Sequence, residues 1–148
     1  MSGTATLFLT GYEGETVKVF LEKLEDSKIT SVIDVRETPL SRKNGFSKNS
    51  LQDILSSVGI DYYHFPELGS PAELREELHS SGDYLSFFKK YRNYIRNEEE
   101  SIRAVSAVIN EDKSPALLCF EKVTDLCHRT ILASEILKVN PHLQVIQI

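Results

Sequence analysis

The chain of 148 residues lacks several features that would place it in a specialised class of proteins. It has no run of about 18 apolar residues, so we expect no membrane-spanning helix. Its N-terminus lacks a basic region followed by an apolar stretch, which argues against a secretory signal. It has only two cysteines, too few for a disulfide framework, and we therefore expect a cytoplasmic protein with reduced thiols.

The sequence signatures of common cofactor and hydrolase sites are also missing. Gly11 and Gly14 do not make up a G-x-G-x-x-G fingerprint, so we expect no dinucleotide or other cofactor. A G-x-S-x-G motif is absent as well, so the sequence does not support the nucleophile elbow of a hydrolase. The net charge of −5 argues against a general nucleic-acid-coating protein but leaves a local basic site open.

What the chain does have is an alternation of short apolar runs with segments of helical periodicity. This alternation predicts βαβ units in a single α/β domain over residues 1–148. We expect a Rossmann-like, three-layer α/β/α sandwich with a mostly parallel sheet of about five strands, the last at an edge. The expected strands are Thr6–Thr10, Ser31–Val35, Ile60–Phe65, Ala116–Phe120 and Leu143–Ile148.

The stretch Pro115–Ala133, reading PALLCFEKVTDLCHRTILA, carries the densest functional signal. A buried strand is followed by a polar turn in which Thr124 and Asp125 offer a helix N-cap. The last long helix is expected over Leu126–Val139, with Cys127-His128-Arg129 in its first turn. Backbone N–H groups and the helix dipole favour anions at such a position.

Polar residues follow each of the first four expected strands. In a parallel sheet these positions share the carboxyl edge, where open α/β sheets bind their ligands. We therefore expect residues that are far apart in the sequence to meet there. The candidates are Tyr12, Asp34, Arg36, Ser41, Arg42, Glu67, Glu121, Cys127, His128 and Arg129.

Four segments together resemble the uncharacterised family catalogued as domain of unknown function 488. They are TGYEG, DVRETPLSRKNGF, FPELGS and LLCFEKVTDLCHRTILA. The resemblance implies a Rossmann-like three-layer fold but no established reaction. Tyr12 stands where the family usually has histidine, and Ser70 replaces a common second glycine. The departure at Tyr12 leaves open whether this member keeps the family's chemistry.

Three arginines are the strongest chemical clue. Arg36, Arg42 and Arg129 would bind an anion, with Ser41 beside them, because a guanidinium matches phosphate or carboxylate with two parallel hydrogen bonds. The alternative is a set of internal ion pairs, with Asp34, Glu67 and Glu121 each neutralising one arginine. Tyr12 and Glu67 would complete the pocket.

His128 is the candidate for proton transfer, with Glu121 or Asp34 orienting it, because imidazole titrates near neutral pH. It could equally cap a backbone group. Cys127 is the reserve nucleophile, since a helix N-terminus favours thiolate, although a packed, inert thiol is the alternative. We expect Cys119 in the core and no metal site, because the cysteines and His128 lack the paired spacing of zinc ligands.

We therefore expect an enzyme that acts on an anionic substrate: a phosphorylated compound, a nucleotide or a nucleic-acid end. A non-catalytic module that binds a nucleotide or nucleic acid is the alternative, and a thiol redox protein is the weaker one. Nucleic acid is suggested by basic residues interleaved with aromatic rings that could stack on bases, although such residues commonly form a solvated face. These residues are Arg36, Arg42, Lys43, Phe46, Lys48, Lys89, Lys90, Tyr91, Arg92, Tyr94 and Arg96.

Overall fold

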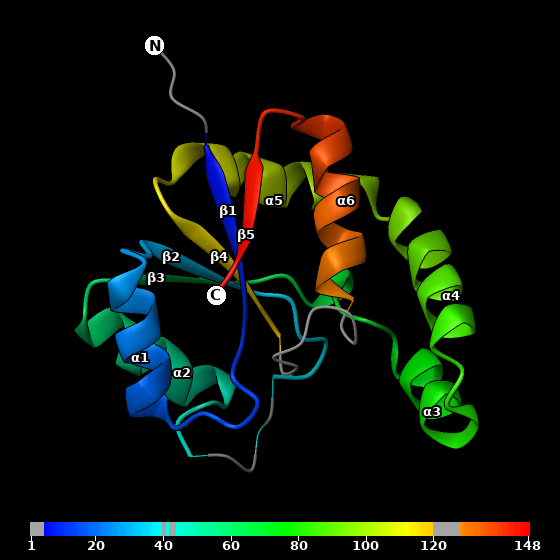
Figure 1. Cartoon of the computed structure of the whole chain (residues 1–148), viewed down its shortest axis with the longest axis horizontal. Helices are drawn as coiled ribbons and strands as arrows, with labels where there is room; N and C mark the ends of the chain where they lie inside the picture. The colour runs from blue at the N-terminus through cyan, green and yellow to red at the C-terminus, as the bar shows by residue number, and fades with distance from the viewer. Residues whose placement is uncertain (1–4, 40, 42–43, 120–127) are drawn as a thin grey trace.

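The computed structural model describes residues 5–39, 41, 44–119 and 128–148. Five strands form one sheet, and helices cover both of its faces (Figure 1). The strands are β1 Thr6–Gly11, β2 Ser31–Asp34, β3 Asp61–His64, β4 Pro115–Cys119 and β5 Gln144–Gln147. The helices are α1 Val17–Asp26, α2 Lys48–Ser57, α3 Ala72–Ser81, α4 Tyr84–Arg96, α5 Glu99–Glu111 and α6 Arg129–Val139, with a 3-10 turn, η1, at Pro66–Leu68.

The strand order is β3-β2-β4-β1-β5, and every neighbouring pair is parallel. The expected three-layer α/β/α fold is therefore confirmed. β5 lies at one edge of the sheet, as the sequence predicted, and β3 lies at the other. The three inner strands read as continuous apolar runs because both of their faces are covered.

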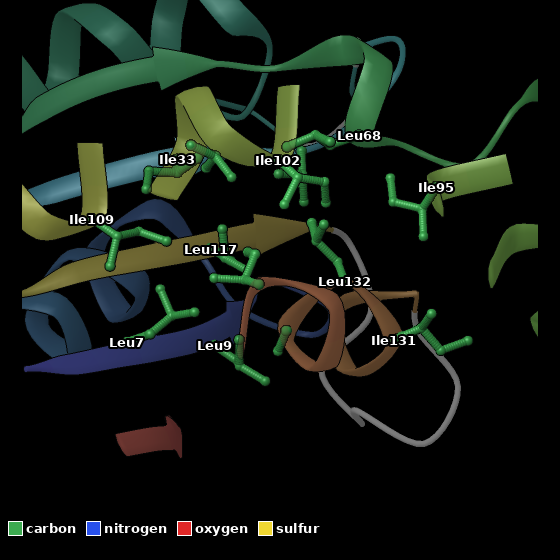
Figure 2. Close-up of a cluster of buried hydrophobic side chains, with 14 of the residues drawn as sticks. Leu7, Leu9, Ile33, Leu68, Ile95, Ile102, Ile109, Leu117, Ile131 and Leu132 are labelled. Atoms are coloured by element: carbon green, nitrogen blue, oxygen red, sulfur yellow. The ribbon is translucent and has the colours of Figure 1, made fainter. Parts of the chain in front are cut away.

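Alternate residues of the strands build two separate cores. Leu7, Ile33 and Leu117 face α5 and α6, and Figure 2 shows them in one cluster with Ile102, Ile109 and Leu132. On the opposite face, Phe8, Val32, Ala116 and Leu118 pack with buried residues of α1 and α2. The period of two along each strand thus assigns neighbouring residues to different layers.

The chain leaves β2 and β4, which are neighbours, toward opposite faces of the sheet. The connection after β2 leads to α2, which packs with α1, whereas the connection after β4 leads to α6 on the other face. Such a switch opens a crevice at the carboxyl edge, which is the usual ligand position in open α/β sheets.

Helices α3 and α4 form a hairpin that projects beside the sheet (Figure 1). α3 ends at Ser81 and is capped by Gly82, whose φ of 69° is left-handed. α3 has no buried residue, and it packs mainly on α4. On α4, Phe87, Tyr91 and Ile95 are buried, whereas Tyr84 is 41% exposed.

His128 occupies the N-cap of α6, and Arg129 is the first helical residue. The expected helix start at Leu126 and the expected caps Thr124 and Asp125 lie outside the described residues. Within the described ranges, no helix combines the length and the apolar composition that a membrane crossing requires.

Candidate functional site

Arg36 lies at the carboxyl end of β2, buried in an internal network. Its Nε and Nη2 donate to the two carboxylate oxygens of Asp34 at 2.8 and 2.7 Å. Its Nη1 donates to the Phe46 carbonyl at 2.7 Å and to the Tyr12 hydroxyl at 3.0 Å. The Tyr62 hydroxyl donates to Asp34 at 2.6 Å. For Arg36, the structure therefore shows the internal ion pair that the sequence left open as an alternative.

The same network holds Tyr12. Its ring stacks on Phe46 with centroids 4.2 Å apart, and only 2% of the residue is exposed. Burial by itself lowers the pKa of Arg36. The hydrogen bond to Asp34 and the charge of Asp34 outweigh this effect, so the pKa of Arg36 is raised above its ordinary value. Burial and the Asp34 charge likewise raise the pKa of Tyr62. The network is therefore a fixed, charged support for the loop that follows β2.

The other predicted site residues are spread around this network. Arg129 is fully buried and its Nη1 donates to the Cys119 sulfur at 2.8 Å. Cys119 is in the core, as expected, but it is disulfide-bonded rather than a reduced thiol.

The remaining predicted residues make contacts away from Arg36. The Ser41 amide donates to the Ser47 hydroxyl, and this hydroxyl donates to the Ser41 carbonyl. The Glu67 carbonyl accepts from the Tyr94 hydroxyl. The predictions for Arg42, Glu121 and Cys127 lie outside the described residues.

A cavity of about 360 Å³ lies between the α3–α4 hairpin and the carboxyl edge of the sheet. Of the predicted catalytic residues, His128 lines it. The described lining holds one arginine and two histidines but no carboxylate. Its members are Ser70, Arg75, Leu78, His79, Gly82, Tyr84, Phe87 and His128.

His128 is placed between two elements of the site. Its Nε2 donates to the carbonyl of Val35, just after β2, at 3.3 Å, and its ring meets the edge of Tyr91 at a centroid distance of 5.0 Å. With the proton on Nε2, Nδ1 is the basic nitrogen of the neutral ring. Burial, together with the smaller effect of the charges of Arg129 and Arg75, lowers the pKa of His128 to about 4, although the Val35 hydrogen bond raises it. The imidazole is therefore neutral at pH 7.

Arg75 brings a positive charge to the cavity from α3. One N–H donates to the Ser70 carbonyl and another to Glu37 at 3.0 Å, so two of its five N–H donors are engaged in these bonds. Its side chain is 44% exposed. Unlike Arg36, it can turn toward a ligand without leaving a buried carboxylate unpaired.

Four residues of the cavity were missed by the sequence analysis: Ser70, Arg75, His79 and Tyr84. Ser70 lies two residues after η1, so its place after the third strand was the available signal. Arg75 and His79 are four residues apart and therefore share a face of α3. Nothing in the sequence shows that this face turns toward His128, because the direction of the hairpin depends on how α4 packs on α6.

The turn that delivers Ser70 to the cavity depends on close backbone contact at Gly69. A Cβ there would lie 2.5 Å from the Glu37 amide nitrogen and 2.8 Å from the Val35 carbonyl oxygen. Two tyrosines hold the same turn, since the hydroxyls of Tyr91 and Tyr94 donate to the two preceding carbonyls of η1, each at 2.6 Å.

We expect Gly69→Ala to lower the free energy of unfolding by about 1 to 3 kcal/mol, because backbone atoms on both sides must move. Urea denaturation measures this cost. Gly59→Ala is the matched control, since Gly59 has a φ of 78° but open space around its Cβ position; it should cost about 1 kcal/mol. An equal or smaller cost at Gly69 would contradict the packing explanation.

The structure argues against base stacking by two of the three aromatic residues that the sequence suggested. Phe46 and Tyr91 are fully buried, so neither offers a ring face to a base. Among the described residues, no group of three or more histidine, cysteine, aspartate or glutamate side chains could hold a metal ion.

Together, these observations define an α/β protein with a parallel sheet and a cavity of small-molecule size at the carboxyl edge. The family model described as Domain of unknown function DUF488 matches residues 16–136, so the chain belongs to this family. The match confirms the resemblance found in the sequence and begins after Tyr12. No curated protein and no solved structure matches the chain.

Proposed function

We propose that this protein is an enzyme that acts on a phosphorylated substrate bound in the cavity between the α3–α4 hairpin and His128. One observation carries the proposal: the cavity combines the half-exposed guanidinium of Arg75 with two imidazoles, and its described lining contains no carboxylate. A phosphate there would meet positive charge and hydrogen-bond donors without a lining carboxylate to repel it.

Two helices strengthen the preference for an anion. α6 begins beside His128, and its first turn contains no acidic residue. α4 begins at Tyr84, which also lines the cavity, although Asp83 caps that helix. The positive ends of both helix dipoles therefore lie near the bound phosphate.

The chemistry that fits these groups is attack of water on the phosphate ester. The neutral ring of His128 takes a proton from the water as its oxygen forms a bond to phosphorus. The bond from phosphorus to the substrate alcohol then breaks, and solvent or the exposed His79 supplies a proton to the departing oxygen. Arg75 stabilises the charge on the phosphoryl oxygens. The Arg36 network supports the loop beside the site.

Substitution of His128 tests the enzyme directly. We expect His128→Asn to lower turnover of phosphate esters by roughly 10²- to 10⁴-fold, since general-base catalysis contributes that much. The assay would use p-nitrophenyl phosphate, bis-p-nitrophenyl phosphate and nucleotides. Wild-type kcat/KM should fall in acid with a limb near pH 4, the pKa of His128 in the unliganded protein.

Controls separate chemistry from folding. His142→Asn, at an exposed position on the loop before β5, should leave turnover unchanged. His128→Gln serves as a second variant where His128→Asn fails to fold, and circular dichroism checks both. Unchanged turnover in a folded His128 variant, or no turnover of any phosphate ester by the wild type, would overturn the enzyme proposal.

The alternative is a module that binds a phosphorylated ligand without chemistry. The burial of Tyr12 favours it, because this side chain stands where the family usually has histidine and is fixed against Phe46. Such a module would bind phosphate with an affinity that falls in Arg75→Ala and with salt, and His128→Asn would leave that affinity unchanged.

A further inference from the structure

We propose that the ligand of the cavity is a nucleoside phosphate, with its phosphate at Arg75 and its base against the ring of Tyr84. This inference rests on the proposed function and names the substrate class. The cavity has two unlike walls. Ser70, Arg75, His79 and His128 supply its polar groups, whereas Leu78, Tyr84 and Phe87 supply apolar surface from the hairpin.

Tyr84 is the part of the apolar wall most available to a ligand. It is 41% exposed, while Phe87 is 7% exposed. The ring contact of Tyr84 within the described residues is a tilted one, at 48° to Phe88 with centroids 6.0 Å apart. No parallel ring is stacked on Tyr84 in that part of the chain, and bases stack on such faces whatever their identity.

The spacing of functional groups along the hairpin also fits a nucleotide. Arg75 and His79 lie on α3, and Tyr84 follows across the turn at Gly82, so charge and ring come from opposite arms of one hairpin. A volume of about 360 Å³ suits a molecule of mononucleotide size and is too small for a duplex. A free nucleotide and the phosphorylated end of a single nucleic-acid strand would present the same phosphate and base to the cavity.

Isothermal titration calorimetry at low salt with adenosine, guanosine and uridine 5′-monophosphates, and with ribose 5-phosphate, tests the inference. We expect each nucleotide to bind about fivefold or more tightly than ribose 5-phosphate, since stacking of one base is worth at least that factor. Tyr84→Ala should remove this advantage and Tyr84→Phe should keep it. Leu85→Ala is the matched control, because Leu85 lies on the same hairpin, is 84% exposed and is not among the lining residues.

The outcomes separate the two proposals. Equal binding of ribose 5-phosphate and nucleotides, or an undiminished nucleotide preference in Tyr84→Ala, would overturn the inference and leave the phosphate site standing. If neither compound binds, the phosphate site itself is wrong. A 5′-phosphorylated trinucleotide distinguishes the two sources: tighter binding than the mononucleotide assigns the site to a nucleic-acid end, and equal or weaker binding assigns it to a free nucleotide.

Discussion

Replacing Arg36 by alanine should lower the free energy of unfolding by about 3 to 5 kcal/mol, the usual cost of leaving one partner of a buried ion pair unmatched. Asp34 is fully buried, and it would lose two hydrogen bonds and its counter-charge. The Tyr12 hydroxyl and the Phe46 carbonyl would lose a donor as well. Thermal melting should show a drop of roughly 10 °C for a chain of this size.

Two further variants decide whether the ion pair is the cause. Lys90→Ala removes a partner of the exposed pair with Glu77 and should change stability by no more than about 1 kcal/mol. The double variant of Asp34 and Arg36 to alanine should cost less than the sum of the two single variants, because each single change leaves the other charge buried. Additive costs, or a loss at Arg36 no larger than at Lys90, would contradict the network.

Acid should destabilise the folded protein through His128. Its pKa is about 4 in the folded state and 6.5 ordinarily, so between these values the unfolded chain binds a proton that the folded chain does not. The stabilisation is fully present above pH 6.5 and is lost as the pH falls toward 4. About 2.5 pKa units correspond to roughly 3 kcal/mol.

Urea denaturation at pH 7.5 and at pH 4.5, compared between wild type and His128→Gln, measures this linkage. The wild type should lose about 2 to 3 kcal/mol more than the variant over that interval. His142→Gln controls for an exposed histidine and should follow the wild type. Equal losses in the free energy of unfolding for wild type and His128→Gln would mean that His128 is not held neutral by burial and by the charges of Arg75 and Arg129.

Much of the fold could be predicted because it follows from local pattern. Short apolar runs alternating with helical periodicity specified the parallel sheet and its β5 edge. The exception is the α3–α4 hairpin. The hairpin projects beside the sheet (Figure 1), and Tyr84, the first residue of α4, is 41% exposed.

The site was predicted less completely, for reasons of charge and packing. His128 could be found because residues after β4 must reach the carboxyl edge. Arg36 also reaches that edge, but Asp34 lies only two residues earlier and engages its guanidinium first. The sequence alone does not show whether an arginine will bind a ligand or a carboxylate of the same chain. Arg75 was missed because its role arises from the docking of a hairpin, which no local pattern encodes.

The central claim is that an anion binds beside His128 and Arg75 rather than beside Arg36. Proton NMR of the four histidines, assigned with single asparagine variants, tests it most directly during titration with inorganic phosphate. The structure predicts shifts for His128 and His79, which line the cavity, and none for the exposed His142. His64 is the histidine that would report on an anion near Arg36, because its Nε2 lies 2.8 Å from the Arg36 carbonyl oxygen. Shifts confined to His64, or no shift in any histidine, would contradict the claim.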